Sequence, residues 1–444
     1  MFCFIFFIMY LSCSKPSSNI QELKSSKPKH YIFLIHGIGG DRSHFGKMKD
    51  ALIKVLSEEN KQEKYSIHHI EYDTKNNQKD IEDFSQVMNN RIQNTVGSNL
   101  PDSDRISIIM HSQGGLVGSI WLFRSMQKLD NYAYDLIDNI DCFITLGTPF
   151  WGAKTAIFAK KLKDDFSKSG LELPIPFGTK QLEYMEFGSD WNYHMRTSII
   201  KSNSIEHVTE QRKKIRFLNI AAKADVLTPL GLFVGGGSKY EDDSAVPLPS
   251  SRFNFIYNHN NIMKEINWAP YILVDALHLS PLPDSPNFYG LVQIPQTCIE
   301  NSYCKHPTFQ IIWNTILNRV QSNQYNEPKN IHSFMVDINL VLPAEINRKD
   351  IKIDLYNEKG LNLENSQIYF SKTELYSQGT NLSKKYQNMI RFYFNGSFKD
   401  SSLLDSENIL VRISGDNLLT KDIPLQVKRG YSSFLDTIME SKQE

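Results

Sequence analysis

The chain has 444 residues with 49 Lys or Arg and 49 Asp or Glu, and its zero net charge excludes nucleic acid as the main partner, because phosphate binding needs a cationic excess. A content of 41% hydrophobic and 11% aromatic residues excludes a disordered chain, and the five cysteines are too few for a disulfide scaffold. The length predicts about two to three domains, and no second apolar run approaches the ~18 residues of a membrane span.

The N-terminal residues 1–12 are predicted to be a signal peptide. They are almost entirely apolar, too short to cross a bilayer and of the length of a signal-peptide core. Ser12 and Cys13, followed by the polar residues 14–18, resemble a bacterial lipoprotein processing site, in which the cysteine becomes the lipidated N-terminus. The resemblance implies lipidation at Cys13, a tether over 13–29, and export to the cell envelope with anchoring to a membrane. An ordinary signal peptide or an uncleaved anchor is the alternative.

Residues 30–322 are predicted to form an α/β domain. Apolar runs of strand length alternate with stretches of helical length, which is typical of a mostly parallel sheet with helices on both faces. The expected strands cover residues 31–35, 66–72, 105–110, 142–146 and 215–221, and the expected helices include 45–56 and 115–129.

A change to period two after residue 330 predicts a second domain. Residues 323–329 are polar and contain Pro328, as expected of a linker. Alternation then recurs in short segments separated by turns, at residues 334–342, 351–355, 390–394 and 409–413. This pattern indicates an all-β, antiparallel, sandwich-like accessory domain over residues 330–430.

Three cysteines become interpretable if the chain is exported. Cys298 and Cys304 are six positions apart in a loop-like stretch. In an oxidising compartment they are expected to close a small disulfide. Cys142 lies in an apolar run and is expected to be a buried thiol.

The strongest chemical signal is a serine between a strand and a helix. An apolar strand runs through Met110 and His111 into Ser112, and a helical stretch follows at once. A serine on such a sharp turn stands out above the edge of the sheet. The positions two before and two after it need small residues, because strand and helix backbones approach closely there. Gly114 meets this requirement and Met110 departs from it.

A second strand ends in a glycine-rich turn, residues 36–40, with the sequence His-Gly-Ile-Gly-Gly. Glycines allow the backbone to present N–H groups to a developing oxyanion. Together with the N–H of the residue after a nucleophile, such a turn forms an oxyanion hole. A strand, a turn of this kind and a later serine elbow in one chain is a far rarer combination than either motif alone.

These residues resemble the α/β-hydrolase family, in its lipase and esterase branch. Residues 36–40 are similar to the lipase oxyanion turn, and residues 111–115, His-Ser-Gln-Gly-Gly, to its nucleophile elbow. Residues 147–153, Gly-Thr-Pro-Phe-Trp-Gly-Ala, resemble a segment frequent in bacterial lipases and GPI-deacylase-like hydrolases. The resemblance implies a serine, an acid and a histidine in that chain order, with oxyanion N–H groups from Ile38 and Gln113.

The resemblance also implies that residues 152–214, inserted between two strands, form a cap or lid. The insertion is rich in aromatic residues. An apolar, aromatic lining would suit an acyl chain. The alternative is that these aromatic side chains simply complete the core.

A serine nucleophile needs a base and an acid that orients it. Asp243 opens a segment that resembles the Asp-Gly-Val-Val-Pro segment of bacterial lipases, and Asp225, directly after an apolar stretch, is the alternative acid. His278 follows the apolar run 271–277 and precedes a loop, where the family places its base, and His306 is the alternative.

The sequence therefore predicts a serine carboxylic ester hydrolase that acts through Ser112, His278, Asp243 and an acyl-enzyme. Lipid or phospholipid esters are the substrates favoured by the resemblance and the expected membrane anchor. The sequence has no zinc, Walker or dinucleotide signature, so we expect no metal and no cofactor. The alternatives are a thioesterase or acyltransferase with the same triad, and a non-enzymatic surface lipoprotein that binds a partner through its C-terminal β domain.

Overall fold

A computed structural model describes most of the chain after residue 26. The described residues are 27–97, 100–153, 156, 178–224, 241–259, 261–280, 282, 284–285, 289–319, 331–344, 346, 350–358, 360, 363, 367–370, 389–400 and 402–442. The predicted signal peptide, the lipidation site Cys13, the alternative acid Asp225 and part of the insertion lie outside them.

The first layer is a six-stranded sheet in the order β2-β1-β3-β4-β5-β8, and every neighbouring pair is parallel. Its strands are β1 (Lys29–Ile35), β2 (Lys64–Ile70), β3 (Arg105–His111), β4 (Ile140–Leu146), β5 (Arg216–Lys223) and β8 (Tyr271–Asp275). The predicted mostly parallel sheet is confirmed. Because the strands are parallel, their carboxyl ends lie at one edge, and the segments that leave this edge carry the predicted triad Ser112, Asp243 and His278 and the predicted oxyanion residues Ile38 and Gln113.

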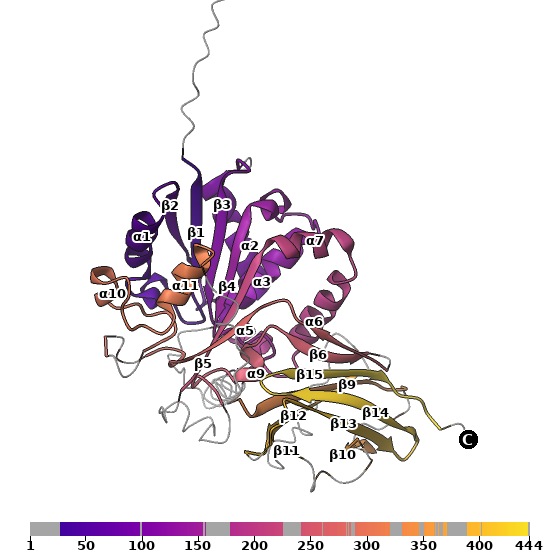
Figure 1. Ribbon diagram of the computed structural model, residues 1–444. Coiled ribbons are helices and arrows are strands. Elements are labelled where there is room, and N and C mark those ends of the chain that lie inside the picture. Colours follow the sequence, from indigo (N-terminus) through magenta and orange to yellow (C-terminus); the bar gives the residue numbers. More distant parts are fainter. Residues whose placement is uncertain are drawn as a thin grey trace, which may run out of the picture.

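Helices cover both faces of this sheet (Figure 1). Along β1, Phe33 and Ile35 belong to the core on one face, whereas Ile32 and Leu34 belong to the core on the other. The first core is covered by α2 (Ile81–Val96) and α3 (Gln113–Met126), and the second by α1 (Met48–Glu59), α10 (Thr297–Glu300) and α11 (Phe309–Ile316). The 3-10 helices are η1 (Arg42–Phe45) and η2 (Tyr134–Asn139).

Two further sheets form the C-terminal part of the molecule (Figure 1). One has the order β11-β12-β9-β15-β6-β7 and the other the order β10-β13-β14. The strands of the first are β11 (Ile368–Phe370), β12 (Met389–Phe398), β9 (Ser333–Val341), β15 (Ser432–Ile438), β6 (Phe255–His259) and β7 (Ile262–Ile266). The strands of the second are β10 (Lys352–Asn357), β13 (Ser406–Gly415) and β14 (Leu418–Lys428). A third apolar core lies between these two sheets, as the alternating pattern predicts for a sandwich.

The larger C-terminal sheet differs from the expectation in two ways. Its strand β15 is parallel to both of its neighbours, so the sheet is mixed rather than antiparallel. The hairpin β6–β7 comes from the earlier part of the chain, before β8, yet joins this sheet through β15. Neither feature has a local sequence signal, because pairing between segments so distant in sequence leaves no periodic mark. The division at residues 322 and 330 itself stays a prediction.

The described part of the insertion between β4 and β5 is helical, with α5 (Thr179–Met185), α6 (Asp190–Ser202) and α7 (Glu206–Lys214). It packs against the C-terminal sheet: the rings of Phe187 and Tyr393 are stacked at 4.3 Å. Arg196 and Asp436 form a buried ion pair, and the Nη1 atom of Arg391 donates to the carbonyl of Gly188 at 2.7 Å. The described aromatic side chains Phe187 and Trp191 are buried in the core that also contains α2 and α3, and the role of residues 152–214 as a cap or lid stays a prediction.

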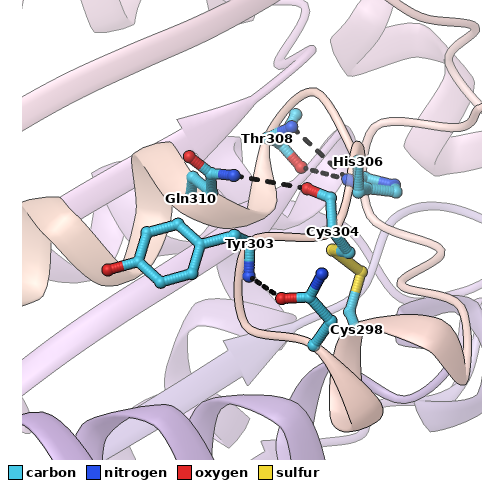
Figure 2. The surroundings of a disulfide bond; sticks show 7 residues. Cys298, Tyr303, Cys304, His306, Thr308 and Gln310 are labelled. Atoms are coloured by element: carbon cyan, nitrogen blue, oxygen red, sulfur yellow. Dashed lines mark hydrogen bonds between the residues drawn. A yellow bond between two sulfur atoms is a disulfide. The ribbon is translucent and has the colours of Figure 1, made fainter.

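A disulfide joins Cys298, in α10, to Cys304 in the loop that precedes α11, as predicted (Figure 2). Cys142 is a buried free thiol. Within the part of the chain that the structure describes, no helix is both long and apolar enough to span a membrane.

Candidate active site

Ser112 occupies the sharp turn between β3 and α3. Its backbone has a φ of 54° and a ψ of −127°, a left-handed conformation that is strained for a residue other than glycine. Its N–H donates to the carbonyl of Leu146 at the end of β4, at 2.9 Å. This strained turn is the geometry that projects a side chain above the carboxyl edge of a sheet.

Close backbone packing explains why glycines surround this turn. A Cβ atom on Gly114 would lie 2.5 Å from the carbonyl oxygen of Ile35 and 2.6 Å from that of His36. A Cβ atom on Gly37 would lie 2.7 Å from the Cβ of Ser112. The end of β1 is therefore pressed directly against the serine and the first turn of α3.

The bulky side chain of Met110 is accommodated by a glycine of helix α3. Met110 is fully buried, and its sulfur lies 2.1 Å from where a Cβ atom on Gly118 would be. The strand has Met110 where the elbow motif calls for a small residue, and Gly118, one helical turn after Gly114, leaves the space that Met110 fills. The sequence showed the missing small residue, but only the packing shows what replaces it.

Asp243 and His278 lie together at the same edge. The Nδ1–H of His278 donates to Oδ2 of Asp243 at 2.8 Å, and the backbone N–H of His278 donates to the carbonyl of Asp243 at 2.7 Å. The other carboxylate oxygen, Oδ1, accepts the N–H groups of Ala245 and Val246 at 3.0 and 2.8 Å. Asp243 is almost fully buried, and the three hydrogen bonds to its carboxylate fix its orientation, while the one from Nδ1 sets the imidazole tautomer.

The Gly-Thr-Pro segment after β4 lies against this pair. Gly147 has a φ of 57°, and a Cβ atom there would be 2.8 Å from Oδ2 of Asp243 and 3.0 Å from Nδ1 of His278. A side chain at this position would displace the acid or the histidine. The glycine is therefore required both by its backbone conformation and by the space it leaves.

His111 packs against His278 and donates a hydrogen bond to it. Its Nε2–H donates to the carbonyl of His278 at 3.1 Å, and the two ring centroids are 4.6 Å apart. Burial holds the pKa of His111 well below its usual value, so the ring is neutral. Since Ser112 follows His111 in the chain, this contact brings Ser112, His278 and Asp243 to one edge of the sheet. The sequence places His111 next to Ser112 but carries no signal for its contact with His278.

The two predicted oxyanion donors follow directly on Gly37, which lies close to the serine, and on Ser112 itself. Ile38 is in the turn that follows β1, closed by a hydrogen bond from Gly40 N–H to Gly37 O at 3.2 Å, and Gln113 is the first residue of α3. Among the hydrogen bonds made by the described residues, none uses the backbone N–H of Ile38 or Gln113. Both groups remain available to an oxygen atom bound next to Ser112.

The alternative base, His306, lies in a different environment. It is buried against Tyr289, with ring centroids 5.0 Å apart, and its Nδ1 lies 3.2 Å from the hydroxyl of Thr308 (Figure 2). Burial lowers its pKa to about 4. The structure pairs it with no carboxylate among the described residues. The alternative acid, Asp225, lies outside them.

No sequence signal marks Glu241, two residues before Asp243. Its Oε2 accepts hydrogen bonds from the N–H groups of His332 and Ser333 at 2.7 and 2.9 Å, which fixes the start of β9 to the loop that carries the acid. Within the described residues, no group of three or more His, Cys, Asp or Glu side chains is placed to hold a metal ion.

Residues 25–163 match a family model described as "Putative serine esterase (DUF676)". This region contains the turn at 36–40, the elbow at Ser112 and the Gly-Thr-Pro segment. No curated protein matches the sequence.

Solved structures resemble much of this chain, two of them over nearly its full length. Phospholipase PlaB from Legionella pneumophila is 11% identical with a TM-score of 0.64, over 93% of this chain and 94% of that one. The same phospholipase in complex with thio-NAD is 12% identical with a TM-score of 0.62, over the same shares. The mature form of Bacillus licheniformis lipase BlEst2 is 14% identical with a TM-score of 0.38, over 65% of this chain and 91% of that one. The chain thus has an α/β-hydrolase fold with a C-terminal β domain, and the family match supports an ester-hydrolysing enzyme.

Proposed function

We propose that this protein is a serine carboxylic ester hydrolase in which Ser112 is the nucleophile, His278 the base and Asp243 the acid. The observation that carries the proposal is the 2.8 Å hydrogen bond from His278 to a buried Asp243, at the sheet edge where Ser112 occupies a strained turn. The family match over residues 25–163 supports the same chemistry.

The mechanism follows from the tautomer of His278. In the neutral imidazole, the proton that is donated to Asp243 lies on Nδ1, so Nε2 is the nitrogen that accepts the hydroxyl proton of Ser112 as its oxygen attacks the ester carbonyl. The N–H groups of Ile38 and Gln113 stabilise the negative charge that develops on the carbonyl oxygen. His278 then protonates the leaving alcohol, which leaves an acyl group on Ser112. In the second half of the reaction, His278 takes a proton from water as the water attacks the acyl-enzyme, and then returns this proton to the oxygen of Ser112 as the acid product leaves.

Lipid or phospholipid esters are the proposed substrate class. The phospholipase PlaB shares the fold over nearly the full length, and the lipase and esterase branch matches the motifs of this chain. The N-terminal residues add a second argument: an envelope lipoprotein anchored through Cys13 would meet its substrate at a membrane surface. The GPI-deacylase-like segment at residues 147–153 is compatible with the same class.

Labelling with a fluorophosphonate probe tests the enzyme. Wild-type protein is expected to label and Ser112→Ala to lose all labelling while it keeps the circular dichroism spectrum of a folded protein. Turnover of a panel of phospholipids, triglycerides and short-chain esters would then establish the substrate class. Absence of wild-type labelling would instead favour the non-enzymatic surface lipoprotein that binds a partner through the β domain.

A thioesterase or acyltransferase would label equally well, because these enzymes share the triad and differ in the acyl donor or acceptor. Transfer of the acyl group to an added alcohol in preference to water would identify an acyltransferase, and faster turnover of thioesters than oxygen esters would identify a thioesterase. The anchor has a separate test: metabolic labelling with palmitate is expected for the wild type and is lost in Cys13→Ala.

A further inference from the structure

The two arms of the proposed oxyanion hole come from different elements, and each extends into one buried hydrogen-bond network. In the first arm, the N–H of Gly39, next to Ile38, donates to Oγ1 of Thr74 at 3.1 Å. In the second arm, the side-chain Nε2 of Gln113 donates to Oε1 of Gln181 at 3.1 Å.

Gln181, on helix α5 of the insertion, closes the connection between the arms. Its Nε2 donates to the carbonyl of Thr74 at 2.8 Å and lies 3.3 Å from that of Asn76. Gln113, Gln181 and Thr74 are all buried, so each lost hydrogen bond would leave a buried polar group without a partner. One amide side chain thus spans from the loop after β2 to the residue after the nucleophile.

The residue before α5, Gly178, is held at the same place. The N–H of Gly178 donates to the carbonyl of Thr74 at 2.8 Å. A Cβ atom on Gly178 would lie 2.2 Å from the carbonyl oxygen of Asn76 and 2.7 Å from Nε2 of Gln181. The backbone approach is therefore as close as glycine allows, and α5 cannot move away without breaking the network.

We propose that Gln181, assisted by Thr74, is a positioning residue that holds the N–H groups of Ile38 and Gln113 in the relative placement needed to bind an oxyanion. The inference rests on the proposed function, because it assigns a role within that reaction. It also gives the insertion a part in the chemistry, because Gln181 of α5 would hold the two oxyanion donors in place without contacting the substrate. An oxyanion hole acts on the transition state, so its disturbance lowers kcat more than it raises KM.

The test compares Gln181→Leu with wild type in ester turnover. We expect kcat to fall about 10-fold to 100-fold with KM changed less than about threefold, a smaller loss than direct removal of an oxyanion donor. A trifluoromethyl ketone, which forms a tetrahedral adduct with a serine, is expected to bind more weakly by a similar factor. The matching methyl ketone, which stays trigonal, is expected to keep its affinity.

Conservative variants test the role at both ends. Gln181→Glu keeps an acceptor for Gln113 but loses the donor to Thr74, and we expect a kcat between those of wild type and Gln181→Leu. Thr74→Val removes the acceptor of the Gly39 N–H and is expected to lower kcat. Thr74→Ser keeps the hydroxyl oxygen and is expected to have the kcat of the wild type. These variants answer the question even where Gln181→Leu does not fold.

Asn192→Ala is the matched control. Asn192 is a buried amide on α6 whose side chain donates to the carbonyl of Glu186 at 2.9 Å, within the insertion. We expect it to lower the melting temperature with kcat unchanged. An equal kcat loss in this control, or wild-type kcat and ketone affinity in Gln181→Leu, would overturn the inference alone. Absence of any wild-type turnover would overturn the proposed function and the inference together.

Discussion

The carboxylate of Asp243 shows how single residues define the site. Its two oxygens accept two backbone N–H groups and one imidazole N–H, so the side chain is fixed although it lies on a loop. The next residue, Ser244, has a φ of 81°, and its N–H is held by the side chain of Asp242 at 2.8 Å. Local hydrogen bonds of this kind substitute for the rigidity of a strand.

This arrangement predicts the effect of an isosteric change. Asp243→Asn is expected to lower kcat about 10³-fold to 10⁴-fold, because an amide that donates toward Nδ1 favours the wrong imidazole tautomer. The measurement is turnover of a short-chain ester, with circular dichroism to verify folding. Asp225→Asn is the control and is expected to keep its turnover. A larger loss in Asp225→Asn would reassign the acid.

At the scale of elements, the site depends on how closely α3 approaches β1. The first turn of α3 touches backbone at Gly114, whereas one turn later it touches the flexible side chain of Met110 at Gly118. A backbone carbonyl cannot yield without moving its strand, but a thioether can rotate. The two glycines of one helix therefore have different functions.

The difference is measurable with two matched variants. Gly114→Ala is expected to lower stability by about 1–3 kcal/mol and kcat about 100-fold, because it displaces the turn that carries Ser112. Gly118→Ala is expected to change stability by less than about 1 kcal/mol, because the higher helix propensity of alanine offsets the cost of moving the Met110 side chain. Urea unfolding and ester turnover give both quantities. Equal effects of the two variants would contradict the distinction.

Much of this element structure could be predicted from the sequence, and the reasons are local. The strands β1, β3 and β4 end in motifs whose glycines and serine follow an apolar run directly, so chain order and periodicity are sufficient. Gln181 could not be found in this way. Its partners Gln113 and Thr74 are 68 and 107 residues away in sequence, and a polar residue in a helical stretch is ordinarily exposed.

At the scale of the whole molecule, the larger C-terminal sheet is a layer shared by two cores. Val336 and Ile338 of β9 face the sandwich core, whereas Met335 of the same strand and Phe434 of β15 belong to the core that also contains α2 and α3. The ring of Phe434 packs against that of Trp151, in the segment that follows β4, with ring centroids 5.1 Å apart. The C-terminal strands thus support the segment that follows the Gly-Thr-Pro motif.

This shared layer also buries charge, and the charge predicts a pH dependence of stability. Asp337 faces Arg196, Arg391, Asp436 and Asn339, and burial raises its pKa to about 6. Because the folded-state pKa lies above the unfolded one, its contribution favours folding at acid pH and is lost as the pH rises through about 6. The ionised carboxylate therefore lowers the free energy of unfolding at neutral pH.

Asp337→Asn is expected to remove this cost. Relative to wild type, the variant gains up to about 3 kcal/mol in the free energy of unfolding at pH 8 and shows little advantage near pH 4. Urea unfolding of both proteins at the two pH values measures the difference, in which all other titrating groups cancel. A variant less stable than wild type at pH 8 would show that the two arginines need the ionised carboxylate.

The position of β15 has a consequence for biosynthesis. β15 follows every other described strand in chain order, yet it lies between β9 and β6 and joins them. On the ribosome, β6 and β9 must therefore wait with one side open until residues 432–438 emerge. A nascent chain without residues 432–438 would carry two unpaired strand edges, and exposed edges of this kind are prone to aggregation.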